Sequence, residues 1–420
     1  MSNKNPNNII DKLFYNVEYT YRNSPFYKNY FKGYWHSNKD NFSLDDYKKL
    51  PFTTKNHLAK NNESFLCIPK NKIAEYVNTS GTIGNPVNVF LSKNDLNRLA
   101  ENEKFSLSIM GGNSQDLYQL LTTLDKQFIA GMAYYLGVQK LNAGIIRIGP
   151  GIMSAQWDSI LNNNPTKLIG VPSFIMKLLD FADENNIPYS SSNVNSIVCI
   201  GEAIRNDHNF ELNNLGRNIT SRWNVELFST YASTEMQTAF SECKVHNGCH
   251  LNNSLLYMEV LNEEGVHVKN NESGEVVITT LGIEGMPLIR YKTGDIARYY
   301  DIPCSCGIKG ARIGCISGRK NQLIKLKGTT IYPQSFINVL NEISFLNIYH
   351  IEVKQNAFHT DEVSLILPLE KMSDQNFSEI KKILKSKIKV TPNFVLKSEK
   401  IIKSLTFSEN KRKPNFITFI

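Results

Sequence analysis

Residues 73–86 read IAEYVNTSGTIGNP, a short apolar strand pattern that runs directly into a turn of hydroxyl residues and glycines. A strand that ends in such a turn is typical of a phosphate site, because backbone N–H groups and hydroxyls can surround an oxyanion. The turn lacks the Gly-Lys-Ser/Thr ending of the P-loop of GTPases and the glycine spacing of dinucleotide-binding folds. We therefore expect a phosphate loop of another kind, with a plain polar β-turn as the alternative.

The segments after this loop predict helices that alternate with strands. Ser92 and Asp95 have the spacing of a capping box, which predicts a helix over residues 93–110. Beyond it, a helical stretch at 172–184 lies among strand patterns at 167–171, 196–200 and 225–228. Such alternation is typical of the α/β class, in which helices and sheets form layers.

The pattern changes after Gly318. Shorter elements follow in the order strand, helix, strand, strand, helix, strand, at 323–327, 333–343, 349–354, 363–369, 374–388 and 393–398. This order predicts a small α+β domain at residues 319–420, behind a large α/β domain at residues 1–318. At the other end of the chain, residues 10–32 have the pattern of an amphipathic helix, with a loop expected at Asn23-Ser24-Pro25 and an aromatic cluster after it.

The composition is that of a folded protein with more than one domain. The chain has 420 residues, which is more than one hydrophobic core usually holds. Of these residues 41% are hydrophobic and 20% are charged, as in folded globular proteins. No apolar run approaches the roughly 18 residues that span a bilayer, and residues 1–12 lack the apolar core of a secretory signal. Seven cysteines, an odd number, fit a reducing compartment. We expect a cytoplasmic protein without a membrane partner.

The positive charge lies entirely in the C-terminal part. The net charge is +8, and residues 319–420 contain 17 Lys and Arg against 9 Asp and Glu. Such a surface suits phosphates, but the lysines are scattered without stacking aromatics between them, so we expect no nucleic-acid partner. A solvated lysine-rich face is the simpler interpretation.

Three further motifs carry chemistry beside the phosphate loop. Residues 229–235 read STYASTE and place Tyr231 four positions before Glu235, so an aromatic ring for a base and a carboxylate for Mg²⁺ come together. Residues 290–295 read RYKTGD, in which Asp295 can accept two hydrogen bonds from a ribose. The third, GRKN at 318–321, lies where the pattern changes domain. Taken singly, each of these is an ordinary turn.

In this order and spacing, the motifs resemble those of the adenylate-forming enzymes, a superfamily that includes acyl-CoA synthetases and peptide synthetase adenylation domains. The resemblance is closest to the phenylacetate-CoA ligase branch. It extends over SPFY at 24–27, LPFTTK at 50–55 and GVPS at 170–173 to Lys411, and so covers nearly the whole chain.

The resemblance implies a site for ATP and Mg²⁺. It makes residues 1–318 the AMP-binding adenylation domain and 319–420 a mobile cap that rotates about Asn321. Lys411 would approach the α-phosphate as a catalytic residue, and Glu235 would act through Mg²⁺. The implied nucleotide-binding residues are Thr79, Ser80, Gly81, Thr82, Gly84, Gly201, Glu202, Ala203, Tyr231, Ser233, Thr234, Asp295 and Arg319.

The chain departs from the family pattern at five places, none of which removes an essential charge. These leave room for slower catalysis or for an acceptor other than CoA, and they are Ile83, Val87, Ala232, Asn321 and Asn410.

A cluster of cysteines and histidines suits a structural zinc ion. Cysteine and histidine recur between residues 243 and 250, and two more cysteines follow in CSC at 304–306. Short spacings of this kind are typical of tetrahedral Zn²⁺, and unpaired surface thiols are the alternative. The resemblance implies the ligands Cys243, His250, Cys304 and Cys306, with His246 and Cys249 as substitutes.

These observations predict an AMP-forming acid-thiol ligase. A small carboxylic acid, expected to be aromatic, would become an acyl-adenylate and then pass to CoA or to the phosphopantetheine of an acyl carrier protein. Its pocket would lie beneath 128–137 and 144–151, where Tyr134, Tyr135 and Ile148 suit a planar acid, unless the tyrosines are ordinary core residues.

Several alternatives stay open. One is transfer of AMP onto a hydroxyl acceptor, as in related coenzyme-adenylylating synthetases, and another is adenylation that feeds a biosynthetic pathway without CoA. A third is a non-catalytic protein that binds nucleotide or nucleic acid through its basic tail. A homodimer is also compatible with the sequence.

Overall fold

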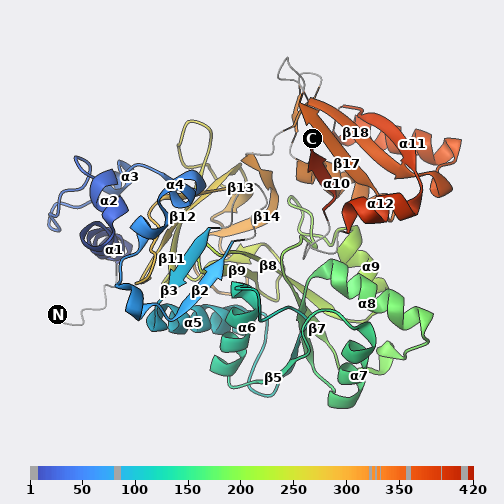
Figure 1. The fold of residues 1–420 in the computed structure, drawn as a ribbon, viewed down its shortest axis with the longest axis horizontal. Helices are drawn as coiled ribbons and strands as arrows, with labels where there is room; N and C mark the ends of the chain where they lie inside the picture. The colour runs from blue at the N-terminus through green and yellow to red at the C-terminus, as the bar shows by residue number, and fades with distance from the viewer. Residues whose placement is uncertain are drawn as a thin grey trace.

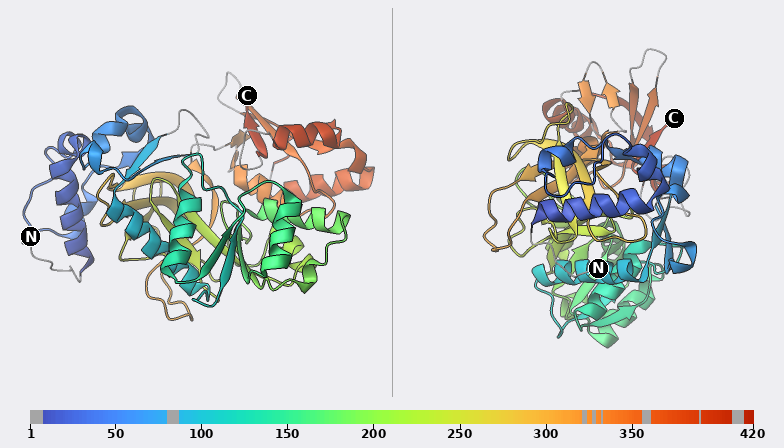
Figure 2. Two further views of the ribbon diagram at one scale, coloured as in Figure 1. Left: turned by 60° about the horizontal axis from the view of Figure 1, so that its bottom comes forward. Right: turned by 90° about the vertical axis from the view of Figure 1, so that its left-hand side faces the viewer.

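A computed structural model describes residues 8–79, 87–320, 324–326, 329–331, 333–355, 361–388, 390–407 and 415–420. The N-terminal helices and the C-terminal part of the chain lie at opposite ends of the molecule, with the large sheet between them (Figures 1 and 2). Within the described residues, no helix combines the length and the apolar character needed to cross a membrane.

The N-terminal part consists of short helices that pack on an aromatic-rich core. The predicted bound at residue 32 is wrong, because the first helix ends at Asn23 and the chain leaves the helical conformation at Ser24 (φ −91°, ψ 119°), within the predicted loop. Pro25 disfavours helical geometry in the residue before it, and the Ser24 side chain instead accepts the N–H of Tyr27 to cap a new helix. The helices are α1 (Ile9–Asn23), α2 (Pro25–Tyr30), α3 (Leu44–Lys48) and α4 (Lys55–Asn61).

The large sheet has the strand order β11-β12-β13-β14-β10-β9-β8-β7-β6-β4-β5, and β1 pairs with β13. Its strands are β1 (Thr53–Thr54), β4 (Leu117–Leu120), β5 (Gly144–Arg147), β6 (Lys167–Gly170), β7 (Ser196–Cys199), β8 (Glu226–Ser233), β9 (Thr238–Glu242), β10 (Cys249–His250), β11 (Leu256–Leu261), β12 (Ser273–Thr280), β13 (Tyr291–Tyr300) and β14 (Arg312–Arg319). A separate hairpin consists of β2 (Glu75–Asn78) and β3 (Asn88–Leu91).

Helices cover the parallel half of this sheet (Figure 1). Ser92 and Asp95 form the predicted capping box, and the predicted helix at 172–184 has those bounds. The helices are α5 (Lys93–Ile109), α6 (Ile129–Lys140), α7 (Met153–Asn163), α8 (Pro172–Glu184) and α9 (Asn214–Arg222). The predicted α/β class is therefore confirmed.

Strand β8 joins the two halves of the sheet. It pairs in parallel with β7 on one side and antiparallel with β9 on the other. Ligands of α/β proteins bind beyond the carboxyl ends of parallel strands, at the point where the sheet topology changes. We therefore expect the ligand-binding site of this fold among the residues that follow β7 and β8.

The C-terminal part forms its own sheet, in the order β19-β18-β17-β20, around its own core, in which Phe336, Ile351 and Leu365 are buried. The predicted α+β pattern holds here, although β16, α12 and β20 were not predicted. The elements are β15 (Ile324–Leu326), β16 (Thr329–Ile331), α10 (Pro333–Asn341), β17 (His350–Gln355), β18 (Asp361–Pro368), α11 (Asp374–Lys387), β19 (Asn393–Lys397), α12 (Glu399–Thr406) and β20 (Ile417–Phe419). It contacts the large part of the molecule where Lys177 of α8 lies 4.2 Å from the ring centre of Phe407.

Candidate active site

Tyr231, Asp295 and Arg319 form a hydrogen-bonded cluster near the carboxyl end of β8. The Tyr231 hydroxyl donates to Asp295 Oδ2 at 2.8 Å, and Arg319 Nε donates to Asp295 Oδ1 at 2.9 Å. Strand pairing positions the second contact, because Asp295 of β13 lies opposite Arg319 of β14. A carboxylate oxygen has two lone pairs, and each oxygen of Asp295 accepts one of these two bonds, so Asp295 has the capacity to accept hydrogen bonds from a ribose diol as well.

The charges of this cluster support one another. Burial of Tyr231 and the neighbouring charge of Asp295 raise the pKa of the phenol well above its usual value, so that it stays a hydrogen-bond donor. Desolvation opposes the charge on Arg319, but the charge and hydrogen bond of Asp295, together with the charges of Tyr231 and Glu235, raise the pKa of the guanidinium overall. The cluster is thus a preorganised set of polar groups beside one buried carboxylate.

Glu235 is the second buried carboxylate at this edge of the sheet, with 8% of its surface exposed. Lys55 Nζ lies 3.7 Å from its Oε1 atom. Tyr291 lies close to both acids, since its pKa is raised well above the usual value by burial and then by the charges of Glu235 and Asp295. Glu235 and Asp295 therefore share one acidic region.

The sequence analysis assigned no role to Lys55, although it quoted the motif that contains it. The position of Lys55 follows from a long-range pairing, in which Thr53 and Thr54 of β1 run parallel to Tyr291 and Lys292 of β13. Helix α4 begins directly afterwards, at Lys55. A contact of this sequence separation leaves no local pattern by which it could be recognised.

The predicted phosphate loop is only partly described. Thr79 is buried, and its hydroxyl accepts the N–H of Val87 at 3.0 Å. Its own N–H donates to the Val87 carbonyl at 3.0 Å, so the two ends of the loop are held together. The other predicted residues of the loop, Ser80, Gly81, Thr82 and Gly84, lie outside the described residues, as do Asn321 and Lys411.

The remaining predicted residues form the turns after β7 and β8. Gly201 has a φ of +75°, which favours glycine, and Glu202 accepts hydrogen bonds from the N–H and the hydroxyl of Ser173 at 2.8 and 2.9 Å. Glu202 therefore caps the N-terminus of α8. The Ala203 carbonyl accepts a bond from Asn213, and the Ser233 hydroxyl accepts the N–H of Met236 at 3.3 Å. Thr234 is half-buried in the same turn.

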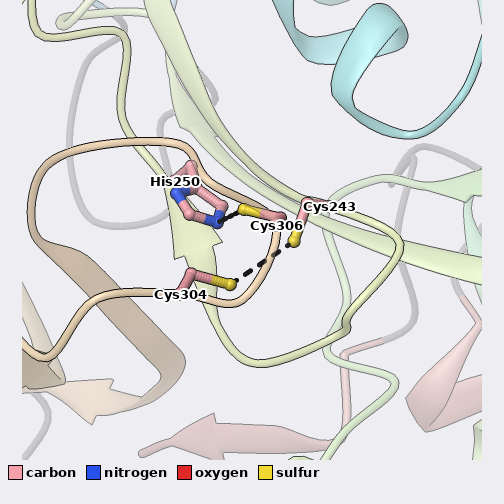
Figure 3. A group of neighbouring side chains, drawn as sticks. All are labelled: Cys243, His250, Cys304 and Cys306. Carbon is pink, nitrogen blue, oxygen red and sulfur yellow. Dashed lines mark hydrogen bonds between the residues drawn. The ribbon is translucent and has the colours of Figure 1, made fainter.

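Four predicted zinc ligands come together between two loops (Figure 3). All the candidate donor atoms lie within 4.8 Å of one another, and the residues are Cys243, His250, Cys304 and Cys306. The two substitutes have other partners: His246 contacts Glu242 and Glu226, and the Cys249 thiol donates to the Ser229 carbonyl.

The distances within this cluster fit a tetrahedral ion. A Zn–S bond of about 2.3 Å separates two thiolates of a tetrahedron by about 3.8 Å. The sulfurs of Cys243 and Cys304 are 3.8 Å apart, and Cys306 Sγ is 3.4 Å from His250 Nε2. Burial, with a contribution from Arg312, lowers the pKa of His250 to about 4, so its imidazole is neutral and has a lone pair for a metal.

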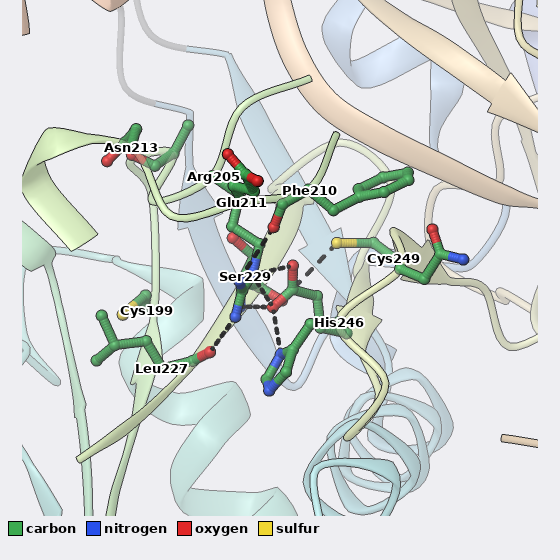
Figure 4. A network of polar contacts seen from close by, with 12 residues as sticks. Cys199, Arg205, Phe210, Glu211, Asn213, Leu227, Ser229, His246 and Cys249 are labelled. Carbon is green, nitrogen blue, oxygen red and sulfur yellow. Dashed lines mark hydrogen bonds and ion pairs between the residues drawn. The ribbon is translucent and has the colours of Figure 1, made fainter. Parts of the chain in front are cut away.

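A buried ion pair connects the metal-site hairpin to β8 (Figure 4). Glu242, next to Cys243, accepts bonds from Arg205 Nε at 2.9 Å and from the Ser229 N–H at 2.9 Å. Arg205 also donates to the Leu227 carbonyl at 3.0 Å. The hairpin thus holds β8 two residues before Tyr231, and Arg205 links the segment after β7 to the same strand.

Comparison with known proteins defines the class of this fold and site. The family model for AMP-binding enzymes matches residues 37–284. The chain belongs to this family. A phenylacetate-coenzyme A ligase of Pseudomonas putida is 24% identical over 387 residues, which cover 87% of this chain and 86% of that protein.

The fold is also similar to that of solved ligase structures. A 2-hydroxyisobutyryl-CoA ligase in the postadenylation state superposes with a TM-score of 0.85 at 18% identity, covering 98% of this chain and 89% of that one. The same ligase in the thioesterification state gives a TM-score of 0.70 at 18% identity, covering 98% and 88%. The predicted family and the predicted class of enzyme, an AMP-forming acid-thiol ligase, are confirmed.

Proposed function

We propose that the chain activates an aromatic carboxylic acid with ATP and transfers the acyl group to the thiol of CoA. The observation that carries this proposal is the cluster of Tyr231, Asp295 and Arg319 beside Glu235, in a chain of the AMP-binding family. A carrier protein's phosphopantetheine is the alternative thiol. The similarity to phenylacetate-coenzyme A ligases supports an aromatic acid.

In the first step, a carboxylate oxygen of the acid attacks the α-phosphorus of ATP. The bond from that phosphorus to the bridging oxygen breaks, and pyrophosphate leaves. In the proposed arrangement Tyr231 contacts the adenine ring, and Asp295 accepts the ribose hydroxyls. Thr79 and the loop after it surround the phosphates, and Lys411 offsets the charge that develops at the phosphorus.

Glu235 is the residue proposed to hold Mg²⁺, which neutralises charge on the phosphates when bound. The Lys55 ammonium lies 3.7 Å from Glu235 Oε1, so a positive charge already neighbours this carboxylate.

In the second step, a thiolate attacks the acyl carbon, and AMP leaves. We propose that the part of the chain after Asn321 rotates between the two steps, which removes Lys411 and opens a path for the thiol. The two TM-scores, 0.85 and 0.70 against one ligase in two states, support an arrangement suited to the first step.

Acid-dependent exchange of labelled pyrophosphate into ATP tests the first step. We expect exchange with aromatic acids, loss of at least about 100-fold in Glu235→Gln, and wild-type activity in Glu264→Gln, an exposed control. Formation of a thioester only when CoA is added would support the second step. If AMP appeared on a hydroxyl acceptor without exchange that depends on an acid, the proposal would be wrong.

We further propose that Cys243, His250, Cys304 and Cys306 hold a structural Zn²⁺ that joins the β9–β10 hairpin to the loop before β14. We expect about one zinc equivalent per purified chain, and a strong chelator should lower the melting temperature. Cys306→Ala should lose the metal, whereas Cys315→Ala, outside the cluster, should keep it. A metal content unchanged by Cys306→Ala would rule out this ligand set.

A further inference from the structure

A group of polar side chains is buried between α5 and the layers that pack on it. Asn102, Glu103 and Ser106 of α5 have between 0 and 3% of their surface exposed. Arg98, one turn earlier on the helix, donates to the Gln237 carbonyl and to the Thr238 hydroxyl, which places this face of α5 against the start of β9. Polar side chains in such a position need hydrogen-bond partners.

Several side-chain polar atoms of this group have no hydrogen-bond partner among the described residues. Glu103 Oε1 accepts a bond from Asn102 at 3.0 Å, but Glu103 Oε2, Asn102 Oδ1 and Ser106 Oγ have no partner. On the strand side, Ser241 Oγ and both side-chain polar atoms of Gln237 also lack one. A buried polar atom left without a hydrogen-bond partner destabilises the fold. A group this large therefore indicates a ligand or bound water that completes it.

This group of buried polar side chains extends to Thr230, the residue before Tyr231. Burial raises the pKa of the Tyr134 phenol, and the charge of Glu103 contributes, so the two side chains are close. The Tyr134 hydroxyl donates to Thr230 Oγ1 at 3.4 Å, a long bond. Thr230 lies opposite Ser241 in the pairing of β8 with β9, so both side chains point to the same face of the sheet. The polar group thus starts beside the candidate active site.

Helix α6 connects this group to the phosphate loop. The N–H of Asn78, which precedes Thr79, donates to the Gln127 carbonyl at 3.0 Å, just before α6 begins at Ile129. A Cβ at Gly137 would lie 2.3 Å from Glu103 Cβ, so α6 passes directly over Glu103. At 1.5 Å per residue, the helix covers about 12 Å between Ile129 and Gly137.

We propose that Glu103 is a specificity-determining residue, which accepts a hydrogen bond from an amino or hydroxyl group at the far end of the acid. This inference rests on the proposed function. With its carboxylate near Thr79, an acid that follows α6 brings its far end to Tyr134 and Glu103. The donor group satisfies Glu103 Oε2, and the neighbouring amide and hydroxyls supply further partners.

An acid without a donor leaves the carboxylate buried and unpaired. A site that hydrogen-bonds a polar group of its substrate strongly rejects an analogue without that group, because its own buried polar atoms then stay unpaired. An apolar pocket discriminates much more weakly against a substrate that carries an extra hydroxyl. Glu103 thus favours the substituted acid chiefly by penalising the plain one.

The test compares pairs of acids in pyrophosphate exchange: phenylacetate with para-aminophenylacetate, and benzoate with para-hydroxybenzoate. We expect wild-type kcat/KM to favour the donor-bearing acid of at least one pair by about 100-fold or more. Glu103→Leu should remove or reverse this preference by lowering activity on the donor-bearing acid and raising it on the plain acid. Glu101→Gln, an exposed change on the same helix, should leave the preference unchanged.

The variants also separate a structural role from recognition. Glu103→Gln keeps the shape of the side chain and still accepts a hydrogen bond, so it should keep part of the preference and serves if Glu103→Leu does not fold. The inference would be overturned if the wild type used plain and substituted acids equally well, or if the preference survived Glu103→Leu. Either result would leave the proposed function intact. Absence of exchange with every acid would overturn both.

Discussion

Asp295 accepts a hydrogen bond on each carboxylate oxygen, from Tyr231 and from Arg319, while it stays almost fully buried. Removal of this carboxylate leaves a phenol and a guanidinium without their acceptor, and it removes the proposed partner of the ribose. Hydrogen bonds to charged groups contribute about 1.5–3 kcal/mol each.

We therefore expect Asp295→Ala to raise the KM for ATP by about tenfold or more, because about 1.4 kcal/mol corresponds to a factor of ten. Tyr231→Phe keeps the ring and removes only the hydroxyl, so its effect should be smaller. Steady-state kinetics with ATP varied at a saturating concentration of the acid measures both. A larger effect of Tyr231→Phe than of Asp295→Ala would show that the hydroxyl, and not the carboxylate, contacts the nucleotide.

Glu103 predicts a pH dependence of stability. Burial raises its pKa from 4.5 to about 7, so between these values the folded chain holds a proton that the unfolded chain has lost. The contribution of Glu103 therefore becomes less favourable as pH rises through this window, by about 3 kcal/mol in all. Urea unfolding should show Glu103→Gln gaining stability relative to the wild type between pH 5 and pH 8. Parallel pH profiles would contradict the assignment.

At the scale of elements, the β9–β10 hairpin contributes to two sites at once. It carries Cys243 and His250 of the metal cluster, and through Glu242 it bonds Arg205 and the backbone of β8. A buried charge that loses its partner costs about 3–5 kcal/mol, whereas an exposed pair contributes about 0–1 kcal/mol.

Arg205→Met should thus lower the free energy of unfolding by about 3–5 kcal/mol, because it leaves Glu242 buried without its cation. The matched control is Arg222→Met, which breaks the more exposed contacts with Asp180 and Asp183 and should cost about 1 kcal/mol or less. Urea denaturation followed by circular dichroism measures both. Similar losses in the two variants would mean that the buried pair has no special role.

Local patterns predicted many elements well, and long-range contacts explain the rest. The helix α8 and the capping box of α5 depend on neighbouring residues, so the sequence predicted them correctly. Tyr231 and Asp295 were predicted because each lies in a motif. The sequence did not predict three features that depend on a partner far away in the chain, which are the position of Lys55, the Arg205–Glu242 pair and strand β20. The loop at 23–25 was predicted from Pro25, but the helix bound at residue 32 was set too late, because the helix ends at Asn23.

At the scale of the whole molecule, the contact between Lys177 of α8 and the ring of Phe407 joins the C-terminal part to the large one. If that part rotates between the half-reactions, this contact must break before the thiol can enter. The chain superposes with a TM-score of 0.85 on a 2-hydroxyisobutyryl-CoA ligase in the postadenylation state and with 0.70 on the same ligase in the thioesterification state. A covalent link at this place should therefore separate the two steps.

The test is the double variant Lys177→Cys with Phe407→Cys, whose two cysteines are joined by a short cross-linker that a reductant cleaves. We expect the cross-linked protein to keep pyrophosphate exchange and to lose thioester formation. Exchange requires only the arrangement in which the contact is present, whereas thioester formation requires it to break. Reduction should restore the second step, and neither single variant should respond to the reagent, which controls for the native cysteines. Thioester formation at the wild-type rate in the linked protein would show that the acyl group is transferred without this rotation.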